Sequence, residues 1–255
     1  MKIKNKTAVI TGGASGLGEA CARRLSGEGA KIVIMDLDQE RGNALAAQLG
    51  GQCAFMPTDI CSSEDIAKAL DHTIAKFGQM DIVINCAGVA SGMKTASRRS
   101  PHDLDHFRKV INTNLVGIFD VMRQAAFRML SNDLNDEDGR GVMINTASIA
   151  AFDGQIGQVA YAASKAALVG MTLPVARDLA AEGIRICTIA PGLFDTPMMQ
   201  GQPEQVRIDL ARKVPFPQRL GDPDEFARLA QQIIENPMLN GETIRLDGAI
   251  RMAPR

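Results

Sequence analysis

Thr11-Gly12-Gly13-Ala14-Ser15-Gly16-Leu17-Gly18 joins a short apolar run to the start of a helical pattern. Glycine permits the tight turn, and the first backbone N–H groups of a helix attract a phosphate. The glycine spacing differs from the G-x-G-x-x-G of many dinucleotide folds, so a purely structural turn stays open as the alternative. As a phosphate turn, the segment would make its contacts through Gly12, Ser15, Gly16, Leu17 and Gly18.

Short apolar runs alternate with longer helical patterns along the whole chain. Strands are expected at Thr7–Thr11, Lys31–Asp36, Cys53–Met56, Asp81–Asn85, Val142–Asn145, Ile184–Ile189 and Thr243–Leu246. Helices are expected near 16–28, 39–49, 62–77, 104–130, 159–181 and 223–236. The strands are almost continuously apolar, which is typical of a parallel sheet covered by helices on both faces. The pattern predicts an α/β, doubly wound, Rossmann-like parallel sheet in a single domain, 1–255.

Asp36 ends the second expected strand, 20 residues after Gly16. In this fold, an acidic side chain at that place accepts hydrogen bonds from the adenosine ribose hydroxyls. The same carboxylate repels a 2′-phosphate, and neither Ser15 nor Leu37 is replaced by a compensating Arg or Lys. The sequence therefore favours NAD over NADP as cofactor. A helix cap or a solvated strand end is the structural alternative for Asp36.

Composition excludes several other classes of function. The chain has 255 residues, 28 basic and 29 acidic side chains, and a formal net charge of −1. This balance disfavours a broad nucleic-acid surface, and aromatic residues at 4% leave few side chains for base stacking. No apolar run reaches about 18 residues, so no membrane span is expected. The first apolar run ends in the Gly-rich turn, so no signal or transit peptide is expected either.

The cysteines and histidines indicate neither disulfides nor a metal site. The five cysteines lack the close spacing of a zinc site or a redox pair, so free thiols are expected. Free thiols favour a reducing compartment, either a bacterial cytoplasm or a mitochondrial matrix. His72, His102 and His106 are not spaced as a ligand set. Two polar stretches, Ser91–Pro101 and Ser131–Gly141, are expected to be surface loops.

Tyr161, the single tyrosine of the chain, stands four residues before Lys165 at the start of an expected helix. Positions i and i+4 share a helix face, so the phenol and the ammonium can lie in one site. A nearby positive charge favours the phenolate, as a base near neutral pH requires. Ser148 follows the fifth expected strand, where its hydroxyl can hold a substrate oxygen. Each residue alone has a structural reading, as a packing residue, a surface charge or a cap, but the combination with the turn favours catalysis.

These motifs together resemble the short-chain dehydrogenase/reductase family. The matches are Thr11–Gly18, Asn85-Cys86-Ala87-Gly88, Asn114, Ser148, Tyr161-x-x-x-Lys165 and Pro191-Gly192, and they extend over essentially the whole chain. The resemblance implies a seven-stranded parallel sheet and a homotetramer or homodimer. It makes Tyr161 the acid/base, Lys165 the ribose ligand that lowers the Tyr161 pKa, Ser148 the substrate-orienting hydroxyl, and Asn114 part of a water-linked proton relay. It also implies further cofactor contacts at Asp59, Ile60, Cys86, Ala87, Gly88, Pro191, Phe194 and Thr196.

A narrower resemblance joins the chain to the type II, short-chain 3-hydroxyacyl-CoA dehydrogenases. It rests on Asn145–Gln155, Gly170–Pro174, Ala190–Phe194, Val214–Pro217, Leu239–Glu242 and Ile244–Met252. It implies NAD-dependent interconversion of 3-hydroxyacyl-CoA and 3-oxoacyl-CoA, a homotetramer, and a substrate contact at Gln155. Ser91–Pro101 departs most from this subgroup and is expected to border the acyl or CoA entrance. A hydroxysteroid or other secondary-alcohol dehydrogenase, a 3-oxoacyl-carrier-protein reductase and a non-catalytic cofactor-binding scaffold remain as alternatives.

Overall fold

Seven parallel strands form one sheet in the computed structural model, which describes residues 1–90, 92–135 and 139–254. The sheet order is β3-β2-β1-β4-β5-β6-β7. The strands are β1 (Thr7–Thr11), β2 (Lys31–Asp36), β3 (Cys53–Pro57), β4 (Ile82–Asn85), β5 (Gly141–Thr146), β6 (Ile184–Pro191) and β7 (Thr243–Leu246). The seven-stranded sheet and the doubly wound α/β class are confirmed.

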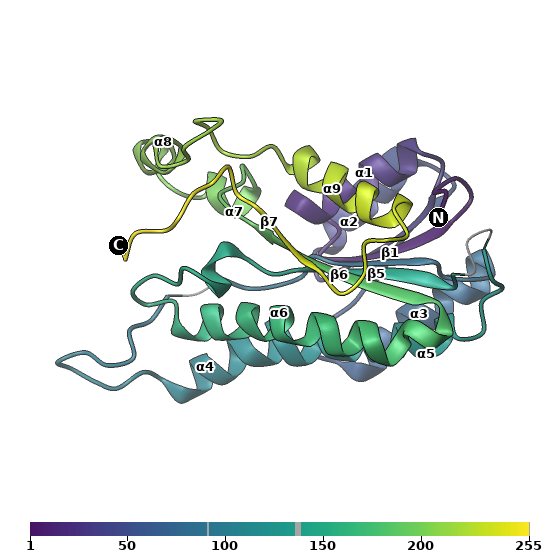
Figure 1. The fold of residues 1–255 in the computed structure, drawn as a ribbon, viewed down its shortest axis with the longest axis horizontal. Helices are drawn as coiled ribbons and strands as arrows, with labels where there is room; N and C mark the ends of the chain where they lie inside the picture. Colours follow the sequence, from purple (N-terminus) through teal and green to yellow (C-terminus); the bar gives the residue numbers. More distant parts are fainter. Residues whose placement is uncertain (91, 136–138, 255) are drawn as a thin grey trace.

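Helices cover both faces of the sheet (Figure 1). One layer contains α1 (Gly16–Gly27), α2 (Gln39–Leu49) and α9 (Pro223–Glu235), and the opposite layer contains α3 (Ser63–Phe77), α4 (Leu104–Ile111), α5 (Ile118–Met129) and α6 (Val159–Leu179). Two short helices, α7 (Pro197–Gln200) and α8 (Glu204–Arg212), lie between β6 and α9. The expected boundaries of α2 and β2 match those of the structure.

Alternation along the strands divides the core into two halves. Ile32 and Ile34 pack with Leu25 of α1 and Phe226 of α9. Val33, the residue between them, packs in the opposite half, with the apolar side chains of α3, α5 and α6. Successive strand residues point to opposite faces, so an uninterrupted apolar run supplies both halves. This explains why the buried strands lack a polar face.

The long helix expected over 104–130 runs without a gap from Leu104 to Met129, but it is not α-helical throughout. A π-helical segment, η1 (Asn112–Gly117), separates α4 from α5, and it contains Asn114. Apolar periodicity continues through one widened turn, so the sequence pattern conceals the interruption. The expected loops are largely exposed where they are described, although Asn132 is buried and Gly141 already belongs to β5. Ser91 and residues 136–138 lie outside the described residues.

Helix α6, with the 3-10 turn η3 (Ala180–Glu182) that follows it, is long and apolar enough to cross a membrane by length and composition alone. Its most apolar window of 18 residues has a mean hydropathy of 1.3. In the fold, the helix lies along the sheet beside β6 (Figure 1), with Leu168 and Ala176 in the core. The buried side also carries the charged Lys165, which is 4% exposed. The side of α6 that faces the sheet thus combines core packing with a buried lysine, and 33% of the apolar window is buried.

Candidate active site

The candidate site residues gather at the carboxyl edge of the sheet. Because the strands are parallel and in register, the residues that follow β1, β2, β4, β5 and β6 all emerge at the same edge. The strand order reverses direction between β1 and β4, which is the switch point where ligands bind in open α/β sheets. The turn after β1 lies directly beside the segment after β4.

The Gly-rich turn is packed so tightly that side chains are excluded. Gly12 has a φ of +62°, and a Cβ there would lie 2.7 Å from the Ala87 nitrogen. A Cβ at Gly18 would collide with the Gly12 carbonyl oxygen. Gly16, with a φ of +57°, lies next to Thr196, the N-cap of α7. The turn thus presents its backbone at the N-terminus of α1, beside the Thr196 and Pro197 side chains, and this cradle fits a pyrophosphate.

Asp36 ends β2 and holds this turn in place. Its Oδ2 accepts a hydrogen bond from the Ala14 nitrogen at 3.0 Å, and its Oδ1 accepts one from the Asp38 nitrogen at 3.0 Å. Each carboxylate oxygen keeps a further lone pair, and the residue is half-buried. The adjacent Leu37 is 71% exposed and adds no positive charge. The site presents a fixed negative charge where an adenosine ribose would bind.

The remaining expected cofactor contacts follow β3, β4 and β6. Asp59 and the buried Ile60 follow β3, and Ala87 donates to the Thr11 hydroxyl at 3.3 Å. A Cβ at Gly88 would lie 3.2 Å from the Asn114 amide oxygen and 3.5 Å from the Lys165 ammonium, so this glycine leaves room beside both side chains. Pro191 ends β6, and Phe194 packs against Gly221. All of these residues thus lie at or just beyond the carboxyl ends of the strands.

Three catalytic candidates meet at the start of α6. The Ser148 hydroxyl lies close enough to the Tyr161 phenol to lower the pKa of that phenol. Lys165 Nζ lies 5.8 Å from the centre of the Tyr161 ring and donates to the Thr146 carbonyl at 2.6 Å. Ser148 caps a 3-10 turn, η2 (Ile149–Ala151), and accepts from the Ala150 nitrogen at 3.1 Å. The predicted grouping of Ser148, Tyr161 and Lys165 is present in the fold.

Burial opposes charge on both titratable groups. It raises the pKa of Tyr161 above its usual value, although the Ser148 hydrogen bond acts in the opposite direction. Burial lowers the pKa of Lys165 to about 8. The expected lowering of the Tyr161 pKa by Lys165 is therefore absent from the cofactor-free chain, because desolvation is the larger effect. A phenolate here needs an additional positive charge beside the ring.

Cys86 lies beside the same site and carries a thiol whose pKa is lowered. A hydrogen bond with the Cys21 thiol lowers the Cys86 pKa despite burial, and Thr146 and Lys165 act in the same direction. The Thr146 hydroxyl lies 3.5 Å from the Cys86 sulfur. All five cysteines lie in described segments, and each is a free thiol.

Asn114 is fully buried within η1. Its amide oxygen accepts from the Val89 nitrogen at 2.8 Å, and its amide nitrogen donates to the Val89 carbonyl at 2.9 Å. The same nitrogen contacts the Ser164 hydroxyl at 3.2 Å, which in turn donates to the Tyr161 carbonyl at 2.7 Å. Asn114 is thus connected to the tyrosine turn through Ser164, a residue that sequence reasoning missed.

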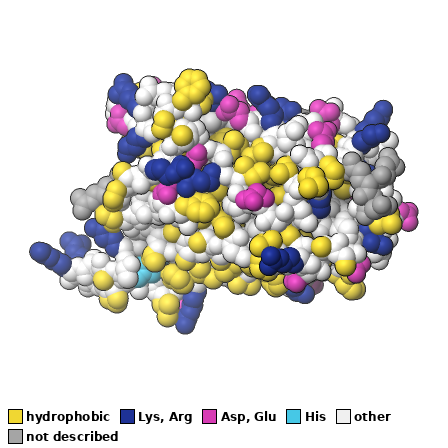
Figure 2. Space-filling view, viewed as in Figure 1, with side chains coloured by type: hydrophobic (Ala, Val, Ile, Leu, Met, Phe, Trp, Pro, Cys, Tyr) yellow, Lys and Arg dark blue, Asp and Glu magenta, His cyan; other side chains and the backbone are white. Residues whose placement is uncertain are grey.

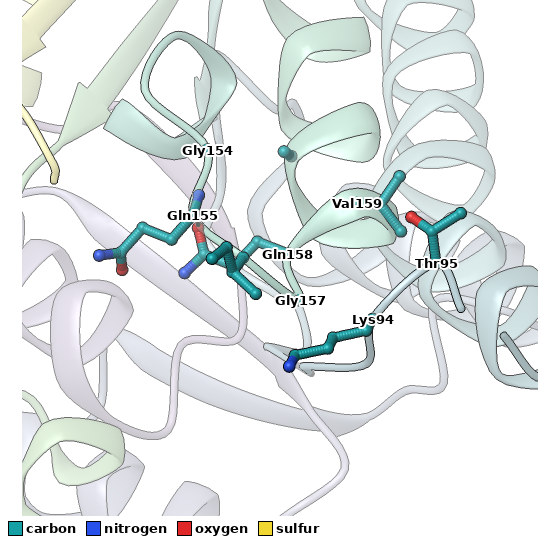
Figure 3. Close-up of a pocket in the computed structure, with 9 residues that line it drawn as sticks. Lys94, Thr95, Gly154, Gln155, Gly157, Gln158 and Val159 are labelled. Carbon is teal, nitrogen blue, oxygen red and sulfur yellow. Dashed lines mark hydrogen bonds between the residues drawn. The ribbon is translucent and has the colours of Figure 1, made fainter. Parts of the chain in front are cut away.

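Gln155 lines a cavity of about 330 Å³ between the loop after η2 and the segment at Lys94 and Thr95 (Figure 3). Its amide nitrogen donates to the Ala253 carbonyl at 2.9 Å. The expected substrate residue is therefore held by the C-terminal tail, a contact that no local sequence signal reveals. In the described parts of the chain, no group of three metal-ligating side chains lies together.

Comparison with known proteins agrees with this geometry. A family model described as short chain dehydrogenase matches residues 6–207. The chain is 55% identical to 3-hydroxyacyl-CoA dehydrogenase type-2 of Drosophila melanogaster over 254 residues, which cover 99% of this chain and 100% of the relative.

Two solved structures share the fold. The crystal structure of 3-hydroxyacyl-CoA dehydrogenase type-2 from Mycobacterium avium has a TM-score of 0.95 at 40% identity and covers 98% of both chains. The 3-ketoacyl-(acyl-carrier-protein) reductase from Brucella melitensis, complexed with NADH, has a TM-score of 0.87 at 26% identity, covering 98% of this chain and 100% of that one. With its phosphate turn, its Ser–Tyr–Lys grouping and these matches, the chain belongs to the short-chain dehydrogenase family.

Proposed function

We propose that the chain is an NAD-dependent 3-hydroxyacyl-CoA dehydrogenase, with residues 1–255 acting as one NAD-binding catalytic domain. The observation that carries the proposal is the meeting of Ser148, Tyr161 and Lys165 beside the phosphate turn. The substrate class follows the relatives that are 55% identical over nearly the whole chain. The reaction interconverts a 3-hydroxyacyl-CoA and a 3-oxoacyl-CoA.

Each of the four candidate catalytic residues would have its own role in the reaction. Tyr161, as phenolate, removes the hydroxyl proton of the substrate, and Ser148 donates a hydrogen bond to the oxygen as it changes to a carbonyl. Lys165 holds the ribose hydroxyls, and Lys165 and Asn114 connect Tyr161 to water. When bound, the nicotinamide ring supplies the hydride acceptor or donor. In reduction the Tyr161 phenol gives its proton to the carbonyl oxygen.

The proposed cofactor contacts lie along the carboxyl edge of the sheet, beginning at the Gly-rich turn. The backbone at Gly12, Ser15, Gly16, Leu17 and Gly18 would face the pyrophosphate. Asp59 and Ile60 would flank the adenine, and Cys86, Ala87 and Gly88 would line the ribose side. Pro191, Phe194 and Thr196 would contact the nicotinamide end. Asp36 favours NAD over NADP because its carboxylate repels a 2′-phosphate.

The substrate would enter between Gln155 and the segment near Lys94. These residues line opposite sides of the 330 Å³ cavity, which opens beside the start of α6 (Figure 3). Gln155 lies seven residues beyond Ser148 on the loop that leads to Tyr161. This placement supports Gln155 as a substrate-side residue and the 92–101 loop as a border of the CoA entrance.

We further propose a homotetramer in a reducing compartment, either a bacterial cytoplasm or a mitochondrial matrix. Hydrophobic side chains gather over α4, α5 and α6 along the lower side of the molecule (Figure 2), including Phe119 and Phe127, which are 45% and 73% exposed. Such a surface is typical of subunit contacts. The free thiols support the reducing compartment.

The decisive test compares initial rates of acetoacetyl-CoA reduction with NADH and with NADPH. We expect turnover with NADH and at least roughly tenfold lower kcat/KM with NADPH, since one unpaired charge contact costs at least about 1.4 kcal/mol. Steroids and simple secondary alcohols form the comparison panel. Absence of CoA-ester turnover alongside good alcohol turnover would reassign the chain to a general alcohol dehydrogenase.

A further inference from the structure

A partly buried ion cluster lies where β7 meets the substrate-side loop. Arg245 Nη2 donates to Asp153 Oδ2 at 2.6 Å, and Arg245 Nε donates to Asp247 Oδ2 at 2.8 Å. The Arg245 side chain is 22% exposed, and its guanidinium lies 5.1 Å from the centre of the Phe152 ring. The cluster thus joins the end of the sheet to the loop that follows Ser148.

The C-terminal tail adds a second set of contacts with the same loop. Gln155 Nε2 donates to the Ala253 carbonyl at 2.9 Å, and the Ile156 nitrogen donates to the Pro254 carbonyl at 3.0 Å. The Met252 backbone also lies close enough to Asp153 to lower the pKa of its carboxyl. Beyond β7 the tail leaves the sheet and continues to the C-terminus (Figure 1), where these contacts place it against the loop. Ion pairs, a side-chain hydrogen bond and a main-chain hydrogen bond therefore all connect the C-terminal end of the chain to the loop that follows Ser148.

Apolar packing completes the connection. Ile250 and Met252 of the tail pack on Ile149, in the 3-10 turn capped by Ser148, and Val214 and Leu193 close this small cluster. It is separate from the two sheet cores. The tail thus contacts the turn that holds the catalytic serine as well as the loop that carries Gln155.

The loop held in this way spans the distance between two catalytic groups. Residues 152–158 begin four residues after Ser148 and end three residues before Tyr161. They include Gly154 and Gly157, and Gly157 has a φ of +89°. Without external contacts a loop with two glycines samples many conformations. The Met93 nitrogen donates to the Gly157 carbonyl at one end of this loop, and the tail contacts hold the remaining part of the cavity wall.

We propose that Arg245 is a positioning residue and that the tail 247–254 is a latch that holds the loop 152–158 against the substrate. The inference rests on the proposed function, since it assigns the cavity to the acyl substrate. Arg245 acts through Asp153 and touches neither cofactor nor reacting atoms. Its guanidinium suits the role because it stays charged and binds two carboxylates in a fixed geometry.

The test uses Asp153→Asn and a chain that ends at Met252, which lacks the Ala253 and Pro254 carbonyls. We expect the KM for acetoacetyl-CoA to rise roughly tenfold in each, with kcat and the KM for NADH changed less than about twofold, because substrate positioning is lost while the reacting groups stay. Hydrogen exchange at 152–158 should accelerate, while exchange in β1 and β4 stays at the wild-type rate.

Arg24→Met is the matched control. Arg24 forms an equally short ion pair, 2.6 Å to Asp224, that joins α1 to α9 away from the cavity. It should alter stability without altering the KM for acetoacetyl-CoA. If Asp153→Asn and the shortened chain change KM no more than Arg24→Met, and loop exchange stays at the wild-type rate, the latch is refuted. If wild-type protein fails to turn over acetoacetyl-CoA, the proposed function fails instead, and loop exchange alone then decides the latch.

Discussion

Tyr161 is the proposed acid/base of the reaction, and its buried surroundings disfavour the phenolate that this role requires. Burial raises its pKa in the cofactor-free chain, and Lys165 Nζ lies 5.8 Å from the ring centre. An added positive charge beside the phenol favours the phenolate, and a bound oxidised nicotinamide carries such a charge. The cofactor is thus expected to switch on the base that the buried site otherwise suppresses.

Because Tyr161 is the only tyrosine, this expectation can be measured directly. In an ultraviolet titration, the phenol of the cofactor-free protein should ionise above its ordinary pKa of about 10, and saturating NAD⁺ should lower that pKa. Tyr161→Phe should lose the signal and reduce turnover by about 10²- to 10⁴-fold, the usual contribution of a general base, while NADH still binds. An unchanged phenol pKa with NAD⁺, or near-normal turnover of the variant, contradicts the assignment.

Lys165 illustrates the cost of function at a single residue. Burial lowers its pKa to about 8 from an ordinary lysine value of 10.5, so the folded state binds the proton less tightly than the unfolded state. This difference lowers the free energy of unfolding by roughly 3 kcal/mol at pH values below the folded pKa. The loss disappears as pH rises from about 8 to 10.5. The hydrogen bond from Lys165 to the Thr146 carbonyl offsets about 1 kcal/mol of this loss in stability.

Lys165→Met should therefore be inactive yet more stable at pH 7. We expect its free energy of unfolding to exceed that of wild type by about 1–2 kcal/mol at pH 7, and the difference to vanish by about pH 10. Urea unfolding at both pH values measures it. Lys68→Met, at an exposed position of α3, controls for loss of a lysine. A variant less stable than wild type at pH 7 would show that the ammonium stabilises the fold.

At the scale of elements, the sequence predicted all seven strands because buried parallel strands are short, apolar runs with sharp ends. Asp36 and Asn85 end their strands where expected. The helix containing Asn114 is also predictable, but its π-helical turn is not, because such a turn leaves apolar periodicity almost intact. The apolar pattern does not reveal α7 or α8. Helix α7 has only 4 residues, and neither helix buries a side chain, so neither has a strong apolar face. The Gln155–Ala253 bond joins positions 98 apart, which local patterns cannot encode.

Asp36 joins the end of β2 to the Gly-rich turn, and we propose that this unit governs cofactor choice. Asp36→Ala removes both the repulsion of a 2′-phosphate and the bond to the Ala14 nitrogen. The NADH-to-NADPH ratio of kcat/KM should fall at least roughly tenfold. Asp38→Ala is the control, because Asp38 caps α2 through the Arg41 nitrogen and should cost stability only. Equal ratios in the two variants would remove Asp36 from cofactor selection.

The whole molecule has two surfaces suited to self-association. Helices α4 and α5 expose apolar side chains, and β7 is a half-buried edge strand at one end of the sheet. Two independent surfaces of this kind permit a tetramer with two types of two-fold contact, whereas one surface gives a dimer. The latch segment follows β7, so assembly at this edge would also constrain the tail.

Light scattering should therefore give a mass of about 109 kDa at micromolar concentration, four times the 27.3 kDa of one chain. Phe127→Asp introduces a charge on α5 where the side chain is 73% exposed, so the folded protomer tolerates it but an apolar contact does not. We expect dimers or monomers from this variant. Phe216→Asp, at a site that is 82% exposed but outside α4, α5 and β7, should remain tetrameric. A tetrameric Phe127→Asp protein would exclude the α5 surface, and a monomeric wild type would exclude the tetramer.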